Sequence, residues 1–103
     1  FMSHVFPRHA KSDLPVVSHG EGVYLFDKAG KQYIDGSCGP ATSCLGHSDP
    51  TVTQAIKDQL DQVAFAHTSF FTCEPAEILA DKLIAHAPKG LDKVYFVSGG
   101  SER

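Results

Sequence analysis

The C-terminal residues 93–103 constrain the fold most, because they join a short apolar run to a glycine turn. Residues 93–97 read Lys-Val-Tyr-Phe-Val, and residues 98–103 read Ser-Gly-Gly-Ser-Glu-Arg. The β-branched and aromatic run predicts a strand, and Glu102 suits the first turn of a following helix. A strand that opens through glycines onto a helix N-terminus presents free backbone N–H groups and the positive end of the helix dipole. We therefore predict an anion site here, with phosphate as the expected ligand.

The glycine turn matches neither common nucleotide-binding motif. Residues 98–101 lack the G-x-x-x-x-G-K-[ST] pattern of P-loops and the G-x-G-x-x-G pattern of dinucleotide-binding folds. A plain connector is the structural alternative, since short Gly/Ser turns are common. The apolar run before the turn and the acidic residue after it favour the phosphate interpretation.

The composition is that of an ordinary small globular chain. It has 103 residues, a formal net charge of −3 and 42% hydrophobic residues, which is enough for one modest core. No block of like charges occurs, so we expect neither nucleic acid nor an anionic membrane as the main partner. No apolar stretch approaches the roughly 20 residues of a membrane helix, and residues 1–7 lack the apolar core of a signal peptide.

The cysteines and histidines form no familiar disulfide or metal pattern. Cys38, Cys44 and Cys73 are odd in number and include no C-x-x-C pair, which fits a reduced, cytoplasmic setting. The histidines show no H-E-x-x-H or close Cys/His spacing, so we expect no metal. We expect three buried or half-buried thiols; the alternative is a reactive thiol at Cys44 beside His47.

The N-terminal third predicts an irregular arm followed by a β-hairpin. Residues 1–21 are largely polar and interrupted by prolines, which is typical of an arm that crosses a surface. Residues 22–26 and 31–35 are expected to pair as strands. The turn at 27–30 begins with an aspartate and ends with a glycine, both favoured in hairpin turns.

A long loop of small residues follows the hairpin. Residues 36–49 contain three glycines, which permit the close approach of a ligand or a neighbouring backbone. The alternative is a plain connector. The length and mild apolarity of the segment favour a functional loop.

Two helices are expected in the rest of the chain. Asp49 can cap the first, which has apolar residues at helical spacing over 49–63. The second runs from about residue 75 to residue 87. Residues 64–74 break the helical period and contain three phenylalanines. They are either a core-anchoring loop, or a pocket wall or subunit contact.

Taken in order, these landmarks resemble the N-terminal part of class III pyridoxal-phosphate-dependent aminotransferases, the group that includes ω-amino-acid and amine transaminases. The resemblance runs from about Gly20 to Glu102, which is most of the chain. Its landmarks are residues 20–27 (GEGVYLFD) with Gly30, 33–36 (YIDG), 45–47 (LGH) with Pro50, the helix over 74–83, and 94–102 (VYFVSGGSE).

The resemblance implies an α/β fold of the fold type I class. Such proteins have a large domain around a mostly parallel sheet, a smaller domain, and a homodimer with sites shared across the interface. Residues 1–21 would be an N-terminal arm. Residues 22–92 would be a small-domain part with the hairpin, the active-site loop and the two helices. Residues 93–103 would be the truncated start of the cofactor-binding large domain, entered by the strand at 93–97.

The resemblance also implies a site for pyridoxal 5′-phosphate. Gly100 and Ser101 match the positions that bind the cofactor phosphate, through backbone N–H groups and the Ser101 hydroxyl. The family usually has alanine after the glutamate, whereas Arg103 stands here. Either the chain is cut at this point or the reading frame changes.

Two further stretches match family positions near the substrate. Pro40 and Ala41 match a stretch that lines the substrate pocket. Ser69 and Phe70 match a stretch that reaches the pocket of the partner subunit. The substrates implied are a small-molecule amino donor and a keto acid.

The resemblance places the reacting groups outside these residues. Aminotransfer needs a lysine that forms a Schiff base with the cofactor and a carboxylate that pairs with its pyridinium nitrogen. In the family both lie downstream of the phosphate loop, and no lysine of this chain matches that motif. We therefore expect no catalytic residue here and no activity from this stretch alone. The full-length protein would transfer an amino group from an amine or ω-amino acid to a keto acid. The alternatives are a truncated, non-catalytic dimerisation fragment and a phosphate-binding module unrelated to amine chemistry.

Overall fold

The computed structural model describes residues 3–10 and 13–101. The chain divides into two compact units, Phe1–Gln59 and Leu60–Arg103, and each is described by itself. Glu102 was expected in the first turn of a helix, and Arg103 stands where the family usually has alanine. Both lie outside the described residues.

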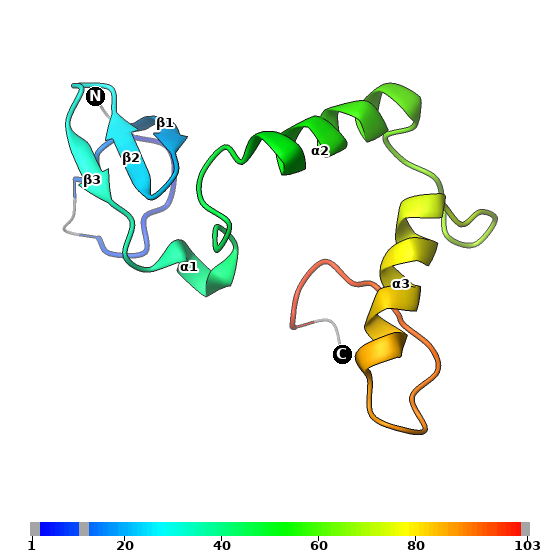
Figure 1. Cartoon of the computed structure of the whole chain (residues 1–103). Coiled ribbons are helices and arrows are strands. Elements are labelled where there is room, and N and C mark those ends of the chain that lie inside the picture. Colours follow the sequence, from blue (N-terminus) through cyan, green and yellow to red (C-terminus); the bar gives the residue numbers. More distant parts are fainter. Residues whose placement is uncertain (1–2, 11–12, 102–103) are drawn as a thin grey trace. The chain divides into compact units, whose positions relative to one another are not determined.

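The first unit contains a three-stranded antiparallel sheet in the order β1-β2-β3 (Figure 1). The strands are β1 (Val17–Glu21), β2 (Tyr24–Asp27) and β3 (Gln32–Ile34). Leu25, in the middle strand, pairs with Gly20 on one side and with Tyr33 on the other. The predicted hairpin is therefore confirmed as β2 and β3.

The side chain of Asp27 organises the turn between β2 and β3. Its Oδ1 accepts hydrogen bonds from the backbone N–H groups of Ala29 and Lys31, both at 2.9 Å. Its Oδ2 accepts a hydrogen bond from the Tyr33 hydroxyl at 2.9 Å. Gly30 has a φ of 83°, which a glycine adopts without steric cost. One carboxylate thus ties the turn to the returning strand.

Strand β1 was not predicted, because residues 17–21 were expected to belong to the irregular arm. The segment is polar and contains Gly20, so its intrinsic strand preference is weak. Pairing with β2 supplies the hydrogen bonds, with an irregular register between Val17 and His19. The His19 ring stacks on Phe26 with ring centroids 4.6 Å apart, a cross-strand contact that stabilises this pairing.

Both predicted helices are present, each within about one residue of the expected bounds. They are α2 (Pro50–Gln62) and α3 (Glu74–His86). The Asp49 carboxylate caps α2, since its Oδ1 accepts a hydrogen bond from the Val52 N–H at 2.9 Å. His86 lies in the last turn of α3, and its ring contacts the Lys82 carbonyl at 2.9 Å. Residues 63–73 between the helices are not helical, as predicted.

The apolar stripes of the helices are exposed. No hydrophobic side chain among the described residues is buried. Ile56 on α2 is 56% exposed, and Leu83 on α3 is 47% exposed. Both helices therefore present open apolar surfaces, and the local structure depends largely on backbone ladders, turns and caps.

The strand predicted over 93–97 is not present. Residues 91–97 have no regular secondary structure, and Tyr95 is 87% exposed. A strand needs a neighbour to pair with its backbone N–H and C=O groups. The described residues of the second unit include no strand, so the apolar run has nothing to pair with in that unit.

Candidate functional site

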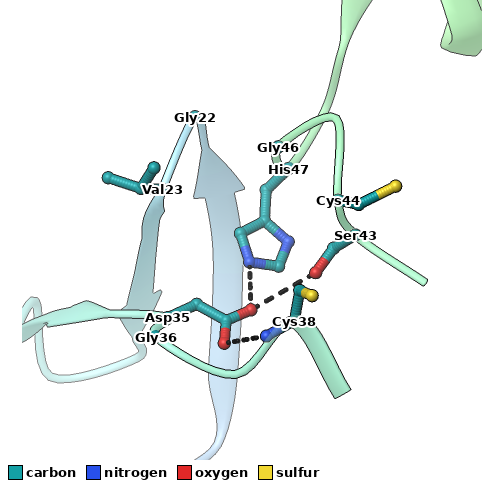
Figure 2. A pocket seen from close by; sticks show the side chains of 9 residues that line it. All are labelled: Gly22, Val23, Asp35, Gly36, Cys38, Ser43, Cys44, Gly46 and His47. Carbon is teal, nitrogen blue, oxygen red and sulfur yellow. Dashed lines mark hydrogen bonds and ion pairs between the residues drawn. The ribbon is translucent and has the colours of Figure 1, made fainter. Parts of the chain in front are cut away.

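A shallow pocket of about 270 Å³ lies beside the end of β3 in the first unit (Figure 2). One wall is formed by Gly22 and Val23, which connect β1 to β2. Asp35, directly after β3, and side chains of the following loop form the rest. The long loop predicted after the hairpin therefore lines a pocket.

Asp35 is the centre of a hydrogen-bond network in this pocket (Figure 2). Its Oδ2 lies 2.8 Å from Nε2 of His47 and accepts a hydrogen bond from the Ser43 hydroxyl at 3.4 Å. Its Oδ1 accepts hydrogen bonds from the backbone N–H groups of Ser37 and Cys38, at 3.2 and 3.0 Å. The side chains of His47 and Asp35 are only 20% and 15% exposed, so the network is half-buried.

These hydrogen bonds lower the pKa of Asp35. The Ser37 N–H contributes most, followed by the His47 side chain and the Cys38 N–H, while partial desolvation acts in the opposite direction. The carboxylate is therefore ionised at neutral pH and can only accept hydrogen bonds. Consequently Nε2 of His47 carries the proton in this contact.

The backbone of His47 is attached to the connection between β1 and β2. The Gly22 N–H donates to the His47 carbonyl at 3.2 Å, and the His47 N–H donates to the Gly22 carbonyl at 2.7 Å. The Ser48 hydroxyl donates to the Gly20 carbonyl at 2.8 Å. Gly46 has a φ of 88°, and a Cβ there would lie 3.2 Å from the Gly22 oxygen. The end of the loop is thus held closely against the sheet.

Pro40 and Ala41, expected near the substrate, lie on this loop in a short helix, α1 (Cys38–Ala41). The helix was not predicted, and it is kinked, since Gly39 and Pro40 have non-helical backbone angles. Ala41 has a φ of 61°. The structure places both residues between Cys38 and Ser43, which line the pocket, and leaves both exposed.

Ser69 and Phe70 lie in a turn of the second unit, organised by His67. The Ser69 N–H donates to Nδ1 of His67 at 3.1 Å, and the Phe70 N–H donates to the His67 carbonyl at 3.0 Å. The ring centroids of His67 and Phe70 are 5.6 Å apart. Phe70 is nevertheless 78% exposed, so its ring presents a large apolar surface.

Gly100 and Ser101 also lie in the second unit, in a turn, and both are exposed. A Cβ built on Gly100 would meet no heavy atom within 4 Å. The space beside this turn is therefore open to a bulky ligand, and the serine hydroxyl is a donor suited to an anion. These features fit a phosphate group.

The sequence did not predict the pairing of Asp35 with His47, which are 12 residues apart. The two residues belong to separate landmarks, 33–36 and 45–47, and the sequence relates His47 otherwise only to its neighbour Cys44. The one local signal was an aspartate followed two residues later by Ser37, a pattern typical of side-chain-capped turns. The pairing depends on how the loop folds back, which spacing alone does not give.

The cysteine prediction was partly wrong. All three thiols are free, and Cys38 and Cys73 are half-buried as expected, but Cys44 is exposed. Across residues 3–10 and 13–101, no group of three or more histidine, cysteine or carboxylate side chains could hold a metal ion. Over the same residues, no helix is long and apolar enough to cross a membrane.

Solved structures with a similar fold are transaminases. A transaminase from the marine bacterium Virgibacillus matches 94% of this chain and 24% of its own, with a TM-score of 0.80 and 34% identity. The taurine:2-oxoglutarate aminotransferase of Bifidobacterium kashiwanohense, solved with PLP and glutamate, has a TM-score of 0.72 and 31% identity. It matches 80% of this chain and 19% of its own. The fold is therefore that of the N-terminal part of fold type I transaminases.

Curated relatives are also aminotransferases. The uncharacterised aminotransferase YodT of Bacillus subtilis is 45% identical over 100 residues, which is 97% of this chain and 22% of that protein. The acetylornithine aminotransferase of Bifidobacterium longum is 40% identical over 91 residues, or 86% of this chain and 21% of that protein. The chain thus spans about a fifth of the length of these relatives. The family model described as aminotransferase class-III matches residues 5–103, so the chain belongs to the class III aminotransferases.

Proposed function

We propose that the polypeptide containing this segment is a pyridoxal-phosphate-dependent aminotransferase. It would transfer an amino group from an amine or ω-amino acid to a keto acid. The observation that carries this proposal is the match of the class III family over residues 5–103. The transaminases with similar folds, one of them solved with PLP and glutamate, support it.

The proposed role of Gly100 and Ser101 is to hold the cofactor phosphate. Their turn is exposed, and the space beside the Gly100 Cα is open. Backbone N–H groups and the Ser101 hydroxyl would donate to the phosphate oxygens. When bound, pyridoxal phosphate supplies an electron sink for the carbanion chemistry of amino transfer. The residues of this segment would bind and orient the cofactor and would not perform the proton transfers.

The remaining proposed roles concern the substrate and a second subunit. Pro40 and Ala41 would line the substrate pocket from their loop. Ser69 and Phe70 would reach the pocket of the partner subunit in a homodimer, and the exposed Phe70 ring supports such a contact. The three free cysteines support a reducing, cytoplasmic setting.

We also propose the domain division implied by the family. Residues 1–21 form the arm, residues 22–92 belong to the small domain, and residues 93–103 begin the large domain. The sheet and pocket of the first unit support assigning the segment around residues 20–50 to the approach to the active site.

The proposal is tested with the full-length polypeptide. Purified protein should absorb visible light as a pyridoxal phosphate protein and should form an amino acid from a keto acid when supplied with amines or ω-amino acids. Ser101→Ala should weaken cofactor binding by roughly tenfold, because one hydrogen bond to a charged phosphate is lost. Thr51→Ala, an exposed change on α2, is the matched control and should bind normally.

Two results would contradict the proposal. Full-length protein that neither binds pyridoxal phosphate nor transfers amino groups would exclude it. Stabilisation by inorganic phosphate but not by pyridoxal phosphate, measured by thermal unfolding, would favour the phosphate-binding module instead.

A further inference from the structure

We infer that Asp35 and His47 form a clasp that fixes the loop of residues 36–46, and that both are positioning residues for the substrate pocket. This inference rests on the proposed function, in which Pro40 and Ala41 of that loop line the pocket.

The clasp joins the two ends of the loop. Asp35 precedes its first residue and His47 follows its last, and the two side chains are 2.8 Å apart. The partners are an ionised carboxylate and a ring N–H donor, and a hydrogen bond to an ionised group is stronger than a neutral one. Bringing the ends of a flexible loop together costs conformational entropy, and this contact offsets that cost.

The same carboxylate also holds the interior of the loop. It accepts hydrogen bonds from the Cys38 N–H at 3.0 Å and from the Ser43 hydroxyl at 3.4 Å. Pro40 and Ala41 lie between these two residues. The loop stretch expected to contact substrate is therefore anchored on both sides to one group.

The loop needs such restraint because its backbone is unusual. Cys38 and Ala41 have φ values of 44° and 61°, in the left-handed region that side-chain-bearing residues rarely adopt. Such conformations persist only where surrounding contacts impose them. The hydrogen bonds from Cys38 and Ser43 to Asp35 hold the residues on either side of this stretch.

The clasp is itself fixed relative to the sheet. The His47 backbone exchanges two hydrogen bonds with Gly22, and the His47 Cβ lies only 2.7 Å from the position that a Cβ on Gly20 would take. Asp35 follows β3 directly. The clasp therefore fixes the loop that carries Pro40 and Ala41 to the sheet, and a precise binding site requires such attachment to a rigid element.

The test compares variants of the full-length protein in steady-state kinetics. His47→Leu removes the donor, and His47→Gln replaces it with an amide N–H at a similar distance from the backbone. Tyr33→Phe is the matched control, because it removes a 2.9 Å hydrogen bond to Asp27 at the far turn of the same sheet.

We expect His47→Leu to raise the KM for the amino donor by roughly tenfold, the effect of losing one charge-assisted hydrogen bond. Bound cofactor per subunit should stay as in the wild type, because the hydrogen bonds described for Asp35 and His47 do not involve the phosphate turn of residues 98–101. His47→Gln should recover most of the KM, and Tyr33→Phe should leave it unchanged.

Three outcomes would overturn the inference. The first is an unchanged KM in His47→Leu, and the second is a loss of cofactor equal to the loss of activity. The third is failure of both His47 variants to fold, which would make the pair a folding determinant.

If the wild-type protein shows no aminotransferase activity, the proposed function fails. The clasp is then judged by limited proteolysis, in which His47→Leu should be cleaved within residues 36–46 faster than the wild type and Tyr33→Phe should not. Equal cleavage rates would overturn it.

Discussion

Gly20 and His47 lie so close together that only a glycine fits at position 20. A Cβ built on Gly20 would lie 2.7 Å from the Cβ of His47 and 3.0 Å from its Cγ. A real Cβ essentially never approaches another carbon so closely, so one of the two segments would have to move. The position of His47 beside the sheet therefore depends on the absence of a side chain at residue 20.

Gly20→Ala should consequently destabilise the first unit. We expect a loss of about 1 to 3 kcal/mol in the free energy of unfolding of the full-length protein, typical of an overpacked site. Chemical denaturation measures this. Gly36→Ala is the control, because a Cβ there meets nothing within 4 Å and its φ is not in the left-handed region. Equal losses in the two variants would show that the close approach of Gly20 and His47 is not the cause.

Acid should weaken the Asp35 network. The pKa of Asp35 is lowered in the folded protein, mainly by the Ser37 N–H and then by His47, so between this pKa and its ordinary value of 3.8 the unfolded chain binds more protons. The network's contribution to stability is therefore complete above the ordinary value and is lost as the pH falls through the folded pKa.

Asp35→Asn should be less stable than the wild type at neutral pH, and its stability should fall less between about pH 5 and pH 3. Denaturation curves across this range test the sign. Asp58→Asn on the exposed face of α2 is the control. A slope in Asp35→Asn equal to that of the wild type would contradict the assignment.

High pH should weaken the hydrogen bond between Tyr33 and Asp27 at the turn between β2 and β3. The Tyr33 hydroxyl donates to Asp27, and this hydrogen bond raises the pKa of Tyr33 above its ordinary value of 10.0. The stabilisation is complete below the ordinary value and is lost as the pH rises through the folded pKa. Isotope-labelled tyrosine titrated by NMR should show one ring that ionises late in the wild type and earlier in Asp27→Asn. An unchanged set of titration curves would show that the contact does not persist in solution.

The cap of α2 should contribute to stability independently of the Asp35 network. Asp49→Ala removes the acceptor of the Val52 N–H and should cost about 1 kcal/mol of stability. Asp61 lies near the end of the same helix. Asp61→Ala should therefore cost much less stability. Denaturation of the full-length variants gives the comparison, and equal costs would mean that the cap contributes nothing.

Local chemistry was sufficient to predict the hairpin and both long helices. Their signals are short-range: the Asp27 turn, the Asp49 cap and apolar residues at helical spacing. The order of the landmarks was sufficient to identify the family, which the family model and the relatives confirm. The length and glycines of residues 36–49 predict a functional loop; the structure shows that this loop lines a pocket, and its function stays a prediction.

The missed features depend on contacts that the propensities of their own residues do not signal. β1 forms because β2 lies beside it, although its own residues favour no strand. The run at 93–97 has strand propensity but no strand to pair with among the described residues of its unit. The contact between Asp35 and His47 appears only when the loop returns to the Gly22 backbone. The proposed roles of Gly100, Ser101, Pro40, Ala41, Ser69 and Phe70 stay predictions.

The Asp35 carboxylate is surrounded by hydrogen-bond donors, which limits the chemistry open to it. A carboxylate offers about four lone-pair directions. Five hydrogen bonds already reach this one: two from the N–H and hydroxyl of Ser37, and one each from Cys38, Ser43 and His47. An incoming substrate proton would find no vacant acceptor there. Asp35 thus has no free acceptor position for a substrate proton, although it lines the pocket, and in the proposed aminotransferase mutagenesis aimed at proton transfer belongs elsewhere.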